Sequence, residues 1–127
     1  MKDERAPRGG VLVVEDDADI LRAIVQVLED ERVPVRAAEN GRAALAVLRE
    51  AGAPRPSVIL LDLMMPVMDG WAFRAEQLRD PTLSDIPVIV LTADGHALEK
   101  AGVLGGVAGL RKPVELTTLL AALAPYL

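Results

Sequence analysis

Short apolar runs alternate with segments of helical periodicity along most of the chain. The five runs are residues 11–14, 33–37, 58–61, 88–91 and, more weakly, 107–110. Three of them are continuously apolar, which is typical of strands buried on both faces in a parallel sheet covered by helices. The pattern therefore predicts five strands, of which the fifth is the weakest.

The segments that follow these runs have the spacing of amphipathic helices. In the first, Ile20, Ile24 and Leu28 recur on one helix face, and Asp17 or Asp19 is suited to cap its start. Further helices are predicted at residues 41–50, 70–79, 97–104 and 115–124. The last helix carries one leucine stripe, which we expect in the core: Leu116, Leu119, Leu120 and Leu123.

Five strand–helix alternations in a chain of 127 residues predict an α/β fold with a doubly wound, five-stranded parallel sheet. Pro34 lies inside the second predicted strand, and proline is tolerated mainly on edge strands. The strand order 2-1-3-4-5, flavodoxin-like (βα)5, satisfies this constraint with right-handed crossovers. We expect residues 1–9 to form a flexible lead-in and residues 10–127 to form one domain.

Composition narrows the classes of function. The net charge of −5 and the presence of only three aromatic residues argue against direct nucleic-acid binding. The absence of cysteine excludes disulfides and cysteine metal sites. The polar start is unlike a signal peptide, and the longest apolar runs are far shorter than the roughly 20 residues that span a bilayer. We therefore expect a soluble, cytoplasmic protein with no membrane partner.

Acidic residues follow two of the predicted strands directly. Glu15, Asp16 and Asp17 come after the first strand, and Asp62 comes after the third. In the predicted sheet the binding crevice lies between the carboxyl ends of these two strands. Two carboxylates about 4 Å apart repel by roughly 4 kcal/mol at an effective dielectric near 20, so a divalent cation is expected there. A site of hard oxygen ligands favours Mg2+.

Two further strand ends complete the candidate site. Thr92 follows the fourth strand and supplies a hydroxyl, and Lys112 follows the fifth and supplies a cation. A metal, a lysine and a hydroxyl donor together suit phosphoryl transfer, in which positioning and charge neutralisation supply most of the catalysis.

These motifs resemble the receiver domain of two-component response regulators. The resemblance covers nearly the whole chain, and four motifs occur in the family's order: Val13-Val14-Glu15-Asp16, Leu61-Asp62-Leu63-Met64-Met65-Pro66 with Met68-Asp69-Gly70, Leu91-Thr92-Ala93, and Lys112-Pro113. Each motif alone is weak evidence, whereas the four at these spacings are specific.

The resemblance implies a phosphoacceptor signalling module and not an enzyme that acts on a diffusing substrate. Asp62 is expected to accept a phosphoryl group from the phosphohistidine of a sensor histidine kinase or a phosphotransfer protein, and then to signal to a downstream protein. The implied metal ligands for Mg2+ are Glu15, Asp16, Asp62 and the backbone carbonyl of Met64, with Asp16 more direct than Glu15. The implied phosphoryl-binding residues are Thr92 and Lys112, and the Lys112-Pro113 peptide is expected to be cis.

The sequence departs from the family pattern on the side that receivers commonly use for output. Gly109 stands where the family usually has an aromatic residue, three positions before the lysine. The stretch between Thr92 and Lys112 is short for the family and rich in glycine, which weakens helices. Its glycines before the fifth strand are Gly95, Gly102, Gly105 and Gly106. The phosphorylation chemistry is expected to be intact, whereas the usual readout is in question.

Two other functions remain open. A pseudo-receiver scaffold that is never phosphorylated agrees with Gly109 but not with the complete set of site residues. A Mg2+-dependent phosphohydrolase that forms an aspartyl-phosphate is suggested by Asp17-Ala18-Asp19, although the chain is short for a capping domain. His96, the single histidine, is expected to be an exposed polar residue and not a phosphodonor.

Overall fold

The computed structural model describes residues 9–100 and 108–127. Within this part of the chain, five parallel strands form one sheet in the order β2-β1-β3-β4-β5. The strands are β1 (Val11–Val14), β2 (Val35–Ala38), β3 (Val58–Asp62), β4 (Val88–Thr92) and β5 (Ala108–Arg111). The predicted fold class and strand order are therefore confirmed.

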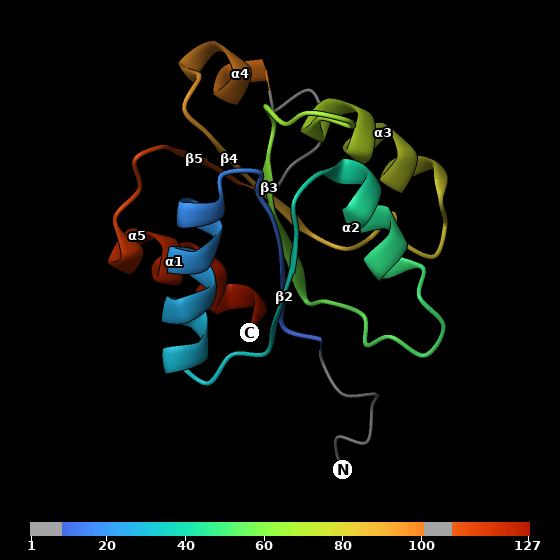
Figure 1. Cartoon of the computed structure of the whole chain (residues 1–127), viewed down its shortest axis with the longest axis horizontal. Helices are drawn as coiled ribbons and strands as arrows, with labels where there is room; N and C mark the ends of the chain where they lie inside the picture. Colours follow the sequence, from blue (N-terminus) through green and yellow to red (C-terminus); the bar gives the residue numbers. More distant parts are fainter. Residues whose placement is uncertain (1–8, 101–107) are drawn as a thin grey trace.

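Helices cover both faces of the sheet, as Figure 1 shows. On one face lie α1 (Ala18–Asp30) and α5 (Leu116–Leu123), and on the other lie α2 (Gly41–Leu48) and α3 (Gly70–Arg79). The short helix α4 (Gly95–Lys100) follows β4, and a 3-10 turn, η2 (Ala124–Tyr126), follows α5. Among the described residues, none of the helices has the length and apolar character needed to cross a bilayer.

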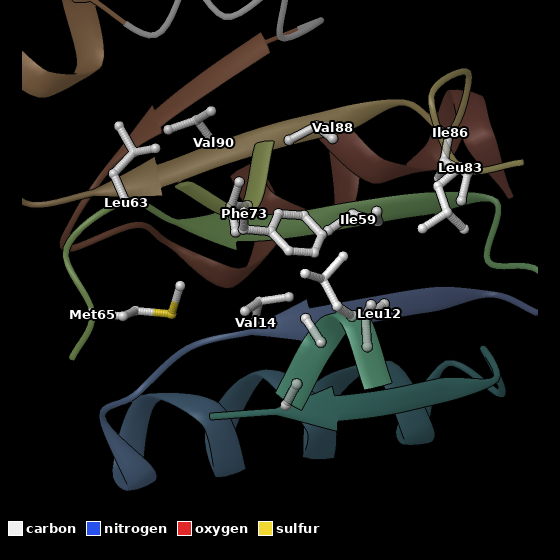
Figure 2. Close-up of a cluster of buried hydrophobic side chains, with 14 residues drawn as sticks. Leu12, Val14, Ile59, Leu63, Met65, Phe73, Leu83, Ile86, Val88 and Val90 are labelled. Atoms are coloured by element: carbon white, nitrogen blue, oxygen red, sulfur yellow. The ribbon is translucent and has the colours of Figure 1, made fainter. Parts of the chain in front are cut away.

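The three central strands are buried along their whole length, which explains their continuous apolar runs. Their side chains alternate between two cores, because successive residues of a strand point to opposite faces. Phe73 of α3 lies with Leu12 and Ile59 in the core beneath α2 and α3 (Figure 2). Leu119 and Leu123 of α5 are fully buried in the other core.

Leu116 departs from the prediction that the leucine stripe is buried. Its side chain is 43% exposed. It is the first residue of α5 and lines a surface hollow beside Pro113, whereas Leu119 and Leu123 lie one and two turns further on against the sheet. The apolar stripe of α5 therefore reaches the core only after its first turn.

Other boundaries were also predicted incorrectly. β2 begins at Val35, which pairs with Val11, so Pro34 precedes this edge strand and is not inside it. A proline has no N–H for the ladder, and Pro34 contributes only its carbonyl, which accepts the N–H of Val11 at 2.9 Å. Helix α4 begins two residues earlier than predicted, because Asp94 Oδ1 accepts the N–H of His96 at the helix start.

Some predictions fall on residues outside the described part of the chain. These are the lead-in at residues 1–8, the end of the predicted helix 97–104, the glycines at positions 102, 105 and 106, and the first residue of the predicted strand 107–110. Gly9, the last residue of the predicted lead-in, is buried, and its N–H donates to the Arg55 carbonyl at 2.8 Å.

Gly10 lies immediately before β1, at a position where only glycine fits. Its φ is +71°, and an added Cβ would lie 1.9 Å from the carbonyl oxygen of Pro34. Gly52 has a similar φ of +78°, but an added Cβ there would meet nothing within 4 Å. Substitutions at the two positions therefore distinguish the cost of the left-handed backbone conformation from the cost of the close contact with Pro34.

We expect Gly10→Ala to lower the free energy of unfolding more than Gly52→Ala. The left-handed conformation costs a non-glycine residue about 1–2 kcal/mol, which is the whole expected effect at Gly52. At Gly10 the backbone clash adds to it, so the loss should exceed about 3 kcal/mol. Urea denaturation of the two variants and the wild type measures the difference. Equal losses in the two variants would contradict the role given to the Pro34 contact.

Candidate functional site

Three charged side chains meet at the carboxyl edge of the sheet. Glu15 follows β1, Asp62 is the last residue of β3, and Lys112 follows β5. The backbone N–H of Lys112 donates to the Thr92 carbonyl at 2.9 Å, which continues the β4–β5 pairing by one residue. The parallel register thus brings together side chains that are up to 97 positions apart in the sequence.

The Lys112 ammonium lies between the two carboxylates. Its Nζ is 2.7 Å from Glu15 Oε1 and 3.2 Å from Asp62 Oδ2. The side chains are 16% exposed for Lys112, 1% for Glu15 and 4% for Asp62. Pairs this well shielded from water are screened far less than ion pairs on the surface, so the lysine offsets much of the repulsion between the two acids.

Backbone N–H groups hold the other oxygen of each carboxylate. Asp62 Oδ1 accepts the N–H of Met64 at 3.2 Å, and Glu15 Oε2 accepts the N–H of Asp17 at 3.0 Å. Both hydrogen bonds span two residues, so the turn that leaves each strand fixes the carboxylate that ends it. The Met64 side chain is 57% exposed and lies outside the core.

The environment shifts the pKa of two members of the site. Burial raises the pKa of the Glu15 carboxyl above its ordinary value, and the neighbouring Lys112 ammonium only partly opposes this. For Lys112, burial would lower the pKa, but the close contact with the Glu15 carboxylate and the negative charge of Asp62 outweigh it and raise the pKa. Lys112 therefore stays charged at neutral pH.

A third carboxylate joins the two buried ones and completes a set that fits a divalent cation. One oxygen each from Glu15, Asp16 and Asp62 lies within 4.8 Å of the others, and Asp16 is exposed. All three ligand atoms are hard oxygens, which suit Mg2+ or a similar cation. Asp17 and Asp19 are instead used at the start of α1, where Asp17 caps the helix and Asp19 pairs with Arg22.

Thr92 lies on the strand next to Asp62 and one residue further along, since Asp62 is paired with Leu91. It is fully buried, and its Oγ1 accepts the N–H of Asp94 at 3.3 Å. The sequence analysis did not single out Asp94, which also receives the N–H of His96. The spacing of a threonine and an acid two residues later, just before a helix, is the local signal that indicates this turn.

The remaining predicted features lie on β5, on α4 and in the segments that follow β3 and β5. The Lys112-Pro113 peptide is cis, as the family resemblance implied. Gly109 is exposed and is paired with Val90 of β4. His96 is exposed in the first turn of α4, as expected. The Met64 N–H donates to Asp62 Oδ1, and the role of the Met64 carbonyl as a metal ligand stays a prediction.

Known proteins resemble this chain over most of its length. Residues 11–124 match the family model of the response regulator receiver domain. Response regulator Rcp1 of Synechocystis sp. is 39% identical over 98 residues, which cover 72% of this chain and 67% of Rcp1. Response regulator PleD of Caulobacter vibrioides is 37% identical over 113 residues, which cover 87% of this chain but only 24% of PleD.

Solved structures agree with these matches. The phosphorylated cyanobacterial phytochrome response regulator RcpA superposes with a TM-score of 0.78 and 32% identity, over 94% of this chain and 91% of RcpA. The Mn2+-bound form of response regulator Rcp1 superposes with a TM-score of 0.73 and 32% identity, over 91% of this chain and 88% of Rcp1.

We expect Lys112→Met to lower the free energy of unfolding at pH 7.5 by about 3 kcal/mol, because it leaves two buried carboxylates without their cation. The raised pKa of Lys112 means that its contribution is fully present below the pKa of an unfolded lysine, so it operates at this pH. The loss should shrink near pH 5, where Glu15, whose pKa is already raised, can take up a proton.

Urea denaturation in EDTA at the two pH values measures this effect. The double variant Glu15→Gln/Lys112→Met is the matched control, and it should recover part of the stability because one buried charge is gone. A Lys112→Met variant as stable as the wild type at pH 7.5 would contradict the pairing.

Proposed function

The chain belongs to the family of response regulator receiver domains, and from this membership we propose that it is a phosphoacceptor signalling module in which Asp62 accepts a phosphoryl group. The donor is a phosphohistidine of a sensor histidine kinase or a phosphotransfer protein. The observation that carries the proposal is the position of Asp62, whose carboxylate lies 3.2 Å from Lys112 Nζ and within 4.8 Å of carboxylate oxygens of Glu15 and Asp16.

Asp62 has the environment that a phosphoryl acceptor needs. Its carboxylate is oriented by the Met64 N–H and by Lys112, so little reorganisation is required before it attacks phosphorus. In the transfer, a carboxylate oxygen of Asp62 bonds to phosphorus while the bond from phosphorus to the imidazole nitrogen breaks. Lys112 holds the phosphoryl oxygens by charge, and the Thr92 hydroxyl donates a hydrogen bond to them.

The acidic cluster is the proposed Mg2+ site. Asp16 and Asp62 are the direct carboxylate ligands, with Glu15 beside them and the Met64 carbonyl completing the set. Both Glu15 oxygens are already engaged, one by Lys112 and one by the Asp17 N–H, whereas Asp16 is exposed. The metal, when bound, neutralises the charge of the phosphoryl oxygens. The solved Mn2+-bound form of the similar protein Rcp1 supports a divalent cation in this fold.

One observation favours a second candidate, a scaffold that is never phosphorylated. Gly109 is exposed on β5 and has no side chain with which to report a change at Thr92. The phosphohydrolase alternative has no such support, because Asp17 and Asp19 serve the start of α1 and not the three-carboxylate cluster. Phosphate incorporation separates the acceptor from the scaffold.

We expect the wild type to gain the mass of one phosphoryl group when it is incubated with acetyl phosphate and Mg2+, and Asp62→Asn to gain none. The substitution removes the nucleophile and relieves repulsion in the site, so the fold should persist. Intact-mass spectrometry measures incorporation, and circular dichroism checks the fold. Asp17→Asn is the matched control, because asparagine still caps α1, and it should label like the wild type. Normal labelling of Asp62→Asn would refute the assignment.

Mg2+ should raise the melting temperature of the wild type by mass action, with about 1.4 kcal/mol of stabilisation at a concentration ten times Kd, and EDTA should reverse the shift. Asp16→Asn should lose this response, while its metal-free form is at least as stable as the wild type because a like charge is gone. Asp19→Asn, which alters an exposed acid outside the cluster, should keep the full response. Thermal melts across a Mg2+ series test this, and an unchanged response of Asp16→Asn would exclude it as a ligand.

A further inference from the structure

An apolar hollow of about 410 Å3 adjoins the acidic cluster. It lies between the first half of α1, the end of β4 and the segment that joins β5 to α5. Its apolar lining includes Ile20, Ile24, Leu91, Pro113, Val114 and Leu116. This volume falls within the range of small-molecule sites, about 300–1,000 Å3. The exposed Leu116 that departed from the predicted core is part of its wall.

The hollow and the proposed phosphoryl site share one residue, Lys112. The ammonium of this lysine pairs with Glu15 and Asp62, and the residue also lines the hollow. Ala93, which follows Thr92 directly, lines it too. Among the described residues of the lining, Lys112 alone is charged, so an occupant matched to the hollow has an anionic head at Lys112 and an apolar body.

A phosphoryl donor must have its leaving group outside the cluster. The acceptor oxygen and the leaving oxygen stand roughly in line on opposite sides of phosphorus. When phosphorus is at Asp62, the group that departs therefore lies on the far side from this carboxylate. A phosphorylated molecule with an apolar leaving group matches both the cation and the hollow beside it.

We propose that this hollow is a leaving-group subsite for small acyl phosphates whose acyl chain is longer than acetyl, such as butyryl phosphate. The proposal rests on the function proposed above for Asp62. In the step, a bond forms between an Asp62 carboxylate oxygen and phosphorus, and the bond between phosphorus and the acyl oxygen breaks. The carboxylate of the acid leaves with that electron pair, so the step requires no proton, oxidant or reductant.

The expected preference follows from the apolar area that the hollow removes from water. The methyl group of acetyl phosphate is too small to fill it, whereas butyryl phosphate adds two methylenes. Each methylene withdrawn fully from water is worth about a factor of four in a rate or binding constant. Because the hollow is open on one side, we expect about a tenfold higher second-order rate constant for butyryl than for acetyl phosphate.

The test compares these two donors by intact-mass kinetics on the whole chain with Mg2+. Acetate and butyrate are leaving groups of nearly equal basicity, so the ratio of the rate constants reports contact and not intrinsic reactivity. Ala23→Phe, on the exposed face of α1 at the rim, should fill the hollow and bring the ratio close to one. Leu116→Ala, which removes part of the wall, should lower it severalfold. Leu78→Ala is the matched control: its leucine is 48% exposed on α3, outside the hollow, and the ratio should stay at the wild-type value.

The outcomes separate this proposal from the one on which it rests. Phosphoramidate, a donor without an acyl group, serves as the reference. Labelling by phosphoramidate and both acyl phosphates with a ratio near one in the wild type would overturn the subsite and leave Asp62 as the acceptor. A high ratio that Ala23→Phe and Leu116→Ala leave unchanged would also overturn the subsite. Failure of every donor to label Asp62 would overturn both proposals.

Discussion

A single ammonium group between two buried carboxylates holds the carboxyl edge of the sheet together. Lys112 reaches from the end of β5 across β4 to Asp62 on β3 and Glu15 after β1, with contacts of 3.2 and 2.7 Å. Without it, the two acids would repel each other where little water can screen them. The apolar strands bring these acids together, and the lysine makes their proximity tolerable in the absence of a metal.

The same balance of charge gives the site its proposed chemistry. Glu15, Asp16 and Asp62 place three negative charges against the one positive charge of Lys112. The cluster therefore keeps a net negative charge, which a divalent cation would balance. With the cation bound, the metal and Lys112 would together attract a phosphoryl group, which a cluster of carboxylates alone would repel. Lys112 also lines the apolar hollow, so its side chain joins the polar and apolar parts of the region where a donor is expected to bind.

The site around Asp62 has all the expected residues, whereas the last strand of the sheet, β5, is mostly exposed. Each family motif that surrounds Asp62 is present, and the central strands are fully buried. In contrast, only Leu110 of the four residues of β5 is even partly buried, and Gly109 presents no side chain next to Val90. A change at Thr92 therefore has no aromatic side chain at position 109 to move, so the proposed phosphorylation of Asp62 would have to be read through other contacts.

The layers, the strand order and the residue types of the site follow from the amino-acid sequence alone. Apolar periodicity and the motifs at strand ends are local patterns, and parallel strands necessarily align their carboxyl ends, so Asp16 and Asp62 could be placed together in advance. Three features emerge only in the folded chain: Glu15 pairs with Lys112, Pro34 precedes its strand, and Leu116 lines the surface hollow. These features depend on register, helix position and distances between segments far apart in the chain, which a local pattern of apolar and polar residues does not encode.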